Sequence, residues 1–250
     1  MDDGVLSKRL WYGFAALQAL LGEHAGRGTV VELHGLVASI VPNAPDSPTL
    51  NAVVAVEPDE APSRLDEMRA RYEDARIRRW GVWLDGRASL AAQALTRAGM
   101  VVTTASPGMA AYIVDVTDDD ADDTSHEADL ETVGRVNDLA YGNYDGRLER
   151  TLRPLPNGML HGYRVDHGGN AAAVALALHH EHDCGISFVA TIPKARRMGL
   201  ATKVMRQALK QAENDGCTTT TLQATDVGER LYHHLGYRHV CEMQLWELRR

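Results

Sequence analysis

The residues best suited to chemistry lie between positions 186 and 202, where an apolar strand, a basic turn and a helix start follow one another. Pro193 ends the strand, because proline cannot donate to a sheet ladder. Gly199 then opens the helix at a point where the backbone must come close to another group. Three cations lie in the turn: Lys194, Arg196 and Arg197. Since a helix start offers unpaired N–H groups and the positive end of a dipole, this stretch predicts an anion-binding site.

The motif Arg196-x-x-Gly199-x-Ala201, directly after an apolar strand, resembles the acyl-CoA signature of the GNAT superfamily of N-acyltransferases. The resemblance implies that backbone N–H groups of the turn cradle the pyrophosphate of CoA. It also implies that a strand N–H near Val189 polarises the thioester carbonyl as an oxyanion hole. The residues expected to bind the cofactor are Val189, Ala190, Thr191, Arg196, Arg197, Met198, Gly199, Leu200, Ala201 and Thr202.

The chain after the turn continues in the order that this family shows. An amphipathic helix is predicted over 199–215, a strand over 217–225 and a last strand over 237–248. Between the two strands, Leu231-Tyr232-x-x-Leu235-Gly236-Tyr237 resembles the family's penultimate helix, and the resemblance implies that Tyr232 protonates the departing CoA thiolate. The alternative is that Tyr232 is a core aromatic of this helix.

The general base is not identified by the sequence. Many members of the family carry a glutamate early in the signature strand, and that position falls near Gly185 here. His180 and His182 have a suitable reference pKa, but they stand in a turn before the strand. The tight cluster from His179 to Asp183 is interpreted as the rim of a hairpin rather than as a metal site, and no metal is predicted.

The N-terminal half repeats the order strand, helix, strand, helix, glycine, strand. The resemblance implies the fold class α/β (α+β), with a GNAT-like mixed, mostly antiparallel sheet flanked by helices. Two tandem units are expected, a degenerate one at 1–115 and a CoA-binding one at 116–250. The connection Glu57–Ser63 carries three carboxylates and no glycine, so the first unit is not expected to bind CoA. Ser63-x-x-Asp66 predicts a capping-box start for a helix that ends at Arg79.

Composition limits the partners. The formal net charge of −8 argues against nucleic acid, and no apolar run is long enough to span a membrane. Eight acidic residues between Asp115 and Asp129 are read as a solvated connector, with steering of a cationic substrate as the less favoured interpretation. Cys184, Cys217 and Cys241 form no close pair, which fits a reducing compartment and a cytoplasmic protein.

The resemblance to the GNAT superfamily implies N-acetyltransfer from acetyl-CoA to a primary amine, expected on a small molecule, by direct attack. Two alternatives remain open. One is a transferase with a longer or carrier-linked acyl donor, and the other is an acyl-CoA-binding sensor without turnover. The sequence names no acceptor and leaves the oligomeric state open, a homodimer included.

Overall fold

The computed structural model describes residues 2–117, 125–156, 158 and 160–248. The chain forms two compact units, Met1–Gly108 with His239–Arg250, and Met109–Arg238. The predicted boundary lies at 115/116, whereas this division falls after Gly108, within β5 (Met100–Tyr112). The last strand β11 (Arg238–Leu248) belongs largely to the first unit, because it pairs antiparallel with β4 (Gly81–Asp85). The middle of the acidic run, 118–124, lies outside the described residues.

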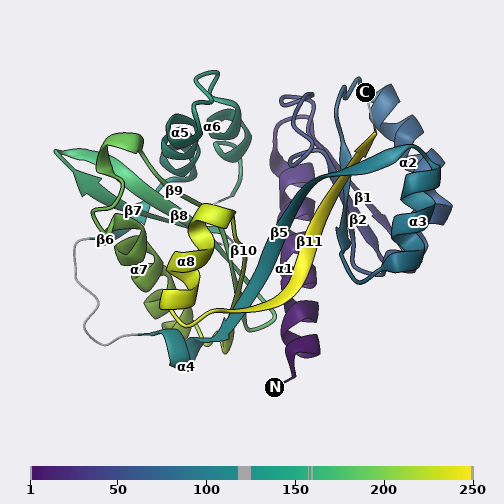
Figure 1. The fold of residues 1–250 in the computed structure, drawn as a ribbon. Coiled ribbons are helices and arrows are strands. Elements are labelled where there is room, and N and C mark those ends of the chain that lie inside the picture. The colour runs from purple at the N-terminus through teal and green to yellow at the C-terminus, as the bar shows by residue number, and fades with distance from the viewer. Residues whose placement is uncertain (1, 118–124, 157, 159, 249–250) are drawn as a thin grey trace. The chain divides into compact units, whose positions relative to one another are not determined.

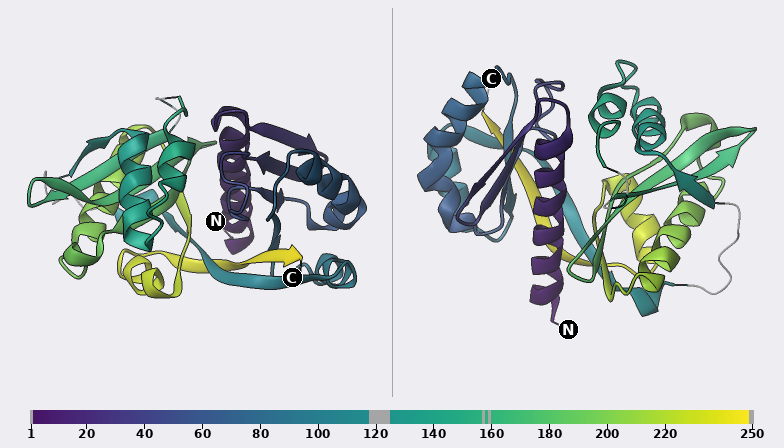
Figure 2. Two further views of the ribbon diagram at one scale, coloured as in Figure 1. Left: turned by 90° about the horizontal axis from the view of Figure 1, so that it is seen from above. Right: turned by 180° about the vertical axis from the view of Figure 1, so that it is seen from behind.

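The strands of the first unit follow the order β1-β2-β3-β4-β11-β5. Helix α1 packs on one face, where Phe14 meets Trp83 edge-on at 5.5 Å between ring centroids. Helices α2 and α3 cover the other face, to which the alternate residues Val82 and Leu84 contribute (Figure 2). The remaining elements are α1 (Asp3–His24), β1 (Thr29–Leu33), β2 (Leu36–Ile40), β3 (Ala52–Ala55), the 3-10 helix η1 (Pro58–Glu60), α2 (Ala61–Asp74), α3 (Ser89–Arg97) and β5 (Met100–Tyr112).

The second unit has the strand order β5-β10-β9-β8-β7-β6, to which β5 contributes its last residues. Helices α5 and α6 lie over one face and α7 over the other (Figure 1). On the α7 face, small side chains of β8 such as Ala175 lie in one buried cluster with the apolar residues of α7, among them Val204 and Ala208. The elements are α4 (Ile113–Val116), β6 (Ser125–Ala128), α5 (Leu130–Tyr141), α6 (Arg147–Leu152), β7 (Leu160–His167), β8 (Asn170–His180), β9 (Asp183–Thr191), the 3-10 helix η2 (Pro193–Ala195), α7 (Leu200–Asn214), β10 (Thr219–Gln223) and α8 (Asp226–His234).

Each unit contains the same core sequence of elements. In the first, β3 leads through η1 and α2 to β4, and in the second, β9 leads through η2 and α7 to β10. Both strand pairs, β3/β4 and β9/β10, are parallel, whereas the other strand pairs with a described register are antiparallel. The predicted mixed, mostly antiparallel sheet with flanking helices is confirmed.

No helix within the described ranges combines the length and apolar character needed to cross a lipid bilayer.

Helix α5 begins at a side-chain cap that gives a test of stability. The carboxylate of Asp129 accepts a hydrogen bond from the Thr132 N–H at 2.6 Å, and this bond lowers the pKa of Asp129. Because the folded pKa lies below the unfolded one, the ionised cap stabilises the fold above the unfolded pKa and loses this effect as pH falls through the folded pKa. Asp129→Ala should therefore lower the free energy of unfolding by about 1 kcal/mol at pH 7. Urea denaturation at several pH values measures it.

Asp129→Asn is the matched control for this cap, because the amide oxygen can accept the same bond without titrating. The deficit of the alanine variant relative to Asp129→Asn should stay constant with pH. Its deficit relative to the unmodified chain should shrink below about pH 4. A deficit unchanged in acid would mean that the Asp129 charge contributes nothing to the cap.

Candidate active site

The turn between β9 and α7 has the backbone that an anion site requires. Gly199 is the N-cap residue of α7 with φ +74°, a left-handed conformation that glycine adopts at no steric cost. Within the described residues, no side chain caps this helix start. The first intrahelical bond of this turn runs from the Lys203 N–H to the Gly199 carbonyl, so the N–H groups of residues 200–202 have no intrahelical partner. They form an unpaired donor set with the positive end of the α7 dipole behind it.

The space beside Gly199 is open. A Cβ placed at this position would meet no protein atom within 4 Å. Most of the turn is exposed, including the cations Lys194 and Arg197, whereas Ala195 is buried beneath it. The surface in front of the helix start is thus accessible and positively charged, as a pyrophosphate-binding turn must be.

The side chain of Arg196 donates to two backbone carbonyls. Its Nε donates to the Thr191 carbonyl at 3.2 Å, and its Nη2 donates to the Ala140 carbonyl at 2.7 Å. The guanidinium therefore ties the end of β9 to the last turn of α5. These contacts give Arg196 a positioning role beside the phosphate contact that the resemblance implies.

Strand β9 carries a bulge just before the turn. Phe188 has φ +52°, and the ladder to β8 shifts so that Val174 pairs with Ala190 but Leu176 pairs with Ser187. Two residues, Phe188 and Val189, thus stand opposite one residue of β8, which is the definition of a bulge. Asn137 of α5 is buried and donates from Nδ2 to the Phe188 carbonyl at 3.4 Å, which supports this backbone from the α5 side.

The bulge coincides with the end of the parallel ladder between β9 and β10. The last paired residues are Ile186 and Leu222, whereas β9 continues to Thr191. Backbone groups of residues 187–191 that point away from β8 therefore have no strand partner on that side. This is the stretch in which the sequence predicted an oxyanion donor near Val189.

Tyr232 lies on α8, the helix that follows β10. Its side chain is 6% exposed and belongs to the same buried cluster as Ala195 and Leu200. Burial raises its pKa above the ordinary value, and the nearby Tyr141 phenol raises it further. Tyr232 is consequently a protonated phenol at neutral pH, the form that can donate to a thiolate.

Two neighbours, Gly228 and Tyr237, pack against the ring of Tyr232. The ring of Tyr232 packs so closely on Gly228, one turn earlier in α8, that a Cβ there would lie 3.0 Å from the ring. Tyr237 meets Tyr232 edge-on at 6.0 Å between centroids. The sequence analysis missed Asn137 and Tyr141, both on α5. Neither residue belongs to a sequence motif, so no local signal identifies them.

The histidines considered as bases stand at the other end of β9. Glu181 and His182 form the two-residue turn between β8 and β9, both with positive φ. At about 3.3 Å per strand residue, Asp183 lies roughly 17 Å from the bulge at Phe188, so His180 and His182 are remote from it. Gly185 is half-buried within β9, and no carboxylate replaces the family's glutamate there.

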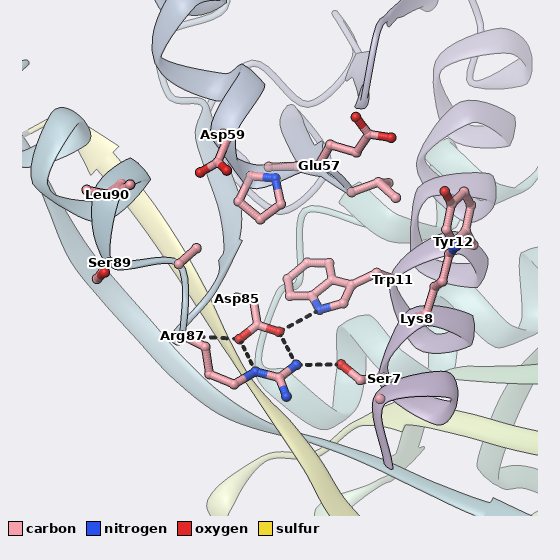
Figure 3. Close-up of a pocket in the computed structure, with 15 residues that line it drawn as sticks. Ser7, Lys8, Trp11, Tyr12, Glu57, Asp59, Asp85, Arg87, Ser89 and Leu90 are labelled. Atoms are coloured by element: carbon pink, nitrogen blue, oxygen red, sulfur yellow. Dashed lines mark hydrogen bonds and ion pairs between the residues drawn. The ribbon is translucent and has the colours of Figure 1, made fainter. Parts of the chain in front are cut away.

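The matching connection in the first unit has the opposite character. Glu57 precedes η1 and none of residues 57–63 has a positive φ, so nothing there corresponds to Gly199. The connection borders a cavity of about 560 Å³ with the carboxylates of Glu57 and Asp59 on its rim (Figure 3). Arg87, a cation of this cavity, is already bound to Asp85 at 2.6 Å.

We therefore expect one acetyl-CoA per chain, bound by the second unit. The carboxylates at residues 57 and 59 repel a pyrophosphate, whereas the turn at 194–199 attracts it. Isothermal titration calorimetry with acetyl-CoA measures the stoichiometry. Lys8→Ala, which removes a cation from the cavity of the first unit, should leave stoichiometry and affinity unchanged. Two equivalents of acetyl-CoA per chain would contradict the expectation.

Comparison with known proteins places this site in a class. The model of the Acetyltransferase (GNAT) family matches residues 126–237, the part of the chain that holds the β9–α7 turn and Tyr232. Residues 126–237 are thus a GNAT acetyltransferase domain, and the chain is a transferase enzyme of the class that takes acyl groups from acetyl-CoA. A comparison with curated protein sequences finds no match.

Solved structures share the fold over most of the chain. A GCN5-related N-acetyltransferase from Kribbella flavida aligns with a TM-score of 0.67 at 20% identity, over 93% of this chain and 94% of its own. A conserved protein of unknown function from Staphylococcus epidermidis aligns with a TM-score of 0.62 at 8% identity, over 88% and 93%. A GCN5-related N-acetyltransferase from Sphaerobacter thermophilus aligns with a TM-score of 0.54 at 12% identity, over 87% and 81%. At these identities the likeness concerns the fold.

Proposed function

We propose that this protein transfers the acetyl group of acetyl-CoA directly to a primary amine of a small molecule. The observation that carries the proposal is the uncapped start of α7 at Gly199, next to the bulge at Phe188 in β9. Together they offer backbone N–H donors for the pyrophosphate and for the thioester carbonyl on one continuous stretch of chain. The residues proposed to contact the cofactor are Val189, Ala190, Thr191, Arg196, Arg197, Met198, Gly199, Leu200, Ala201 and Thr202.

The reaction assigns one task to each part of this stretch. The amine nitrogen attacks the thioester carbon, a C–N bond forms, and negative charge develops on the carbonyl oxygen. A backbone N–H near Val189 stabilises this oxyanion, because the ladder between β9 and β10 ends at Ile186 and leaves such groups without a β10 partner. The C–S bond then breaks, the nitrogen loses its proton to solvent, and Tyr232 gives a hydrogen bond or a proton to the thiolate. Where Tyr232 gives its proton, it regains one from solvent, so that the amide and the free thiol of CoA are the products.

The acceptor is proposed to be neutral or cationic. The net charge of −8 favours the approach of cations over that of anions, although net charge acts on encounter rather than on the chemical step. For the same reason nucleic acid is not proposed as a partner. A cytoplasmic location stays a prediction, supported by three cysteines that are buried and free.

The test is release of free CoA thiol from acetyl-CoA in the presence of a panel of amines, with mass spectrometry of the products. Amine-dependent thiol release and an acetylated amine are expected. Tight acetyl-CoA binding without thiol release for any amine would instead support the acyl-CoA-binding sensor without turnover. A sensor needs only the binding turn between β9 and α7. Faster turnover with longer acyl-CoA donors than with acetyl-CoA would support the transferase with a longer or carrier-linked acyl donor. Acetylation of a strongly anionic acceptor at a rate insensitive to salt would contradict the proposed acceptor class.

A further inference from the structure

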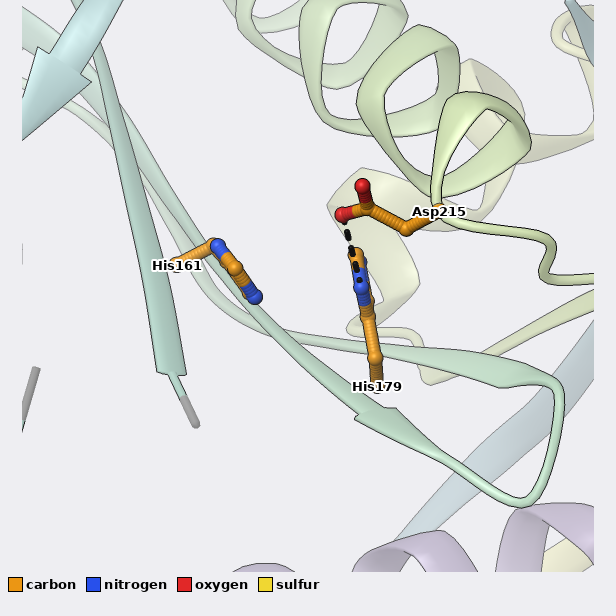
Figure 4. Close-up of side chains that lie close together, drawn as sticks. All are labelled: His161, His179 and Asp215. Carbon is orange, nitrogen blue, oxygen red and sulfur yellow. Dashed lines mark ion pairs between the residues drawn. The ribbon is translucent and has the colours of Figure 1, made fainter. Parts of the chain in front are cut away.

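Three potential metal ligands converge at the end of α7 that is remote from Gly199. His161 lies on β7, His179 on β8, and Asp215 is the C-cap residue of α7. One ligand atom from each side chain lies within 4.8 Å of the others. Figure 4 shows the two imidazole rings side by side, stacked at 4.5 Å between centroids, with the Asp215 carboxylate directed at His179.

The fold brings these residues together although they are far apart in sequence. His161 pairs with Ala177 across the β7–β8 ladder, so His179, two residues further along β8, projects from the same face. Helix α7 covers this face and ends at Asp215, after which Gly216 turns the chain with φ +81°. The sequence pattern had grouped His179 with its neighbours in the hairpin, whereas the structure groups it with residues of β7 and α7.

The Asp215 carboxylate is already oriented by two other side chains, Gln211 and His179. Gln211 donates from Nε2 to Oδ1 of Asp215 at 2.9 Å, and Oδ2 of the same carboxylate lies 3.2 Å from Nδ1 of His179. Hydrogen bonds of this kind orient the ligands of protein metal sites.

Two buried polar atoms at this place lack partners among the described residues. One is Nε2 of His179, and the other is the hydroxyl of Tyr163, which lies two residues after His161 on β7 and is 2% exposed. Buried polar groups without a partner are costly, so each asks for a water or an ion.

We propose that His161, His179 and Asp215 form a binding site for a divalent transition-metal ion, with zinc as the best match. Two imidazole nitrogens and one carboxylate oxygen are a donor set that zinc prefers, with a fourth position left for water. Helix α7 has 15 residues and is therefore about 22 Å long, so the ion would lie far from the acyl-CoA turn. Its effect would be to join β7, β8 and α7, and the test does not depend on acetyltransferase activity.

The experiment is titration of the chelator-treated full chain with zinc chloride, followed by calorimetry and by a melting curve at each zinc concentration. One high-affinity zinc per chain and a melting temperature that rises with zinc are expected. Asp215→Asn and His179→Gln should each weaken zinc binding by about tenfold or more. Asp215 is exposed at a helix end, so its variant tests the site even where His179→Gln does not fold.

His180→Gln is the matched control, because His180 is the neighbouring residue and projects from the opposite face of β8. Its zinc affinity should equal that of the unmodified chain. Absence of a high-affinity site, or equal losses in His180→Gln and Asp215→Asn, would overturn the proposal. Cobalt substitution checks the ligands. A thiolate-to-metal charge-transfer band would also overturn the assignment, since it would place Cys184 or Cys217 on the metal instead.

Discussion

Gly199→Val should reduce the affinity for acetyl-CoA by a factor of about 100 or more while both units stay folded. The present Cβ position is empty, with no protein atom within 4 Å, so the new side chain occupies the space in front of the helix start rather than the core. That space is where a pyrophosphate must approach the N–H groups of residues 200–202. Loss of two charge-assisted hydrogen bonds, at about 1.5–3 kcal/mol each, gives the expected magnitude.

A second effect of Gly199→Val is backbone strain, because valine is unfavourable at φ +74°. Gly99→Val is the matched control. Gly99 has φ +81° and an equally empty Cβ position, but it lies in the first unit, between α3 and β5. Both variants should show a similar loss of stability in denaturant, and only Gly199→Val should lose acetyl-CoA binding in calorimetry. Unchanged affinity in folded Gly199→Val would show that the cofactor does not sit at this helix start.

The second unit could be predicted from sequence because its signals are local. Pro193 ends a strand, Gly199 needs a left-handed conformation, and the apolar residues of α7 repeat at helical spacing on one face. Each of these patterns depends only on nearby residues, and the structure has the corresponding elements in the expected order. The repeat of strand, turn, helix and parallel strand in the first unit was visible for the same reason.

The features that sequence analysis did not find depend on tertiary partners. The predicted capping box at Ser63 is wrong, since α2 begins at Ala61 and the Ser63 hydroxyl donates back to the Glu60 carbonyl at 2.9 Å. The position of β11 beside β4 follows from long-range pairing that no local pattern records. The bulge at Phe188 places an aromatic residue at positive φ, which propensity disfavours.

The same limit applies within the candidate site. An arginine in the signature motif predicts a phosphate contact, but only the structure reveals that Arg196 donates to carbonyls of Thr191 and Ala140. Likewise, His161 and Asp215 had no visible link to His179 until β7, β8 and α7 were placed. Side-chain chemistry was readable from the sequence, whereas the choice of partner was fixed by sheet register and by helix packing.

Tyr232→Phe should lower kcat by about 100-fold and leave the affinity for acetyl-CoA nearly unchanged. The phenol is buried and its pKa is raised, so it is protonated at the pH of the assay and can give a proton or hydrogen bond to sulfur. This contact strengthens as negative charge develops on the leaving thiolate, so its loss falls on the rate rather than on binding. Since a thiolate can also leave unaided, the low end of the range for general acid catalysis is expected.

Tyr237→Phe is the control for Tyr232→Phe, because it removes a neighbouring buried phenol with a structural partner. The Tyr237 hydroxyl lies 2.8 Å from Oγ1 of Thr220, so its loss should cost about 1 kcal/mol of stability and leave kcat intact. Steady-state kinetics, acetyl-CoA titration and melting curves of both variants separate the two roles. An unmodified rate in folded Tyr232→Phe would make Tyr232 a core residue only. The acid would then be sought at Tyr141, whose phenol lies close enough to Tyr232 to raise its pKa.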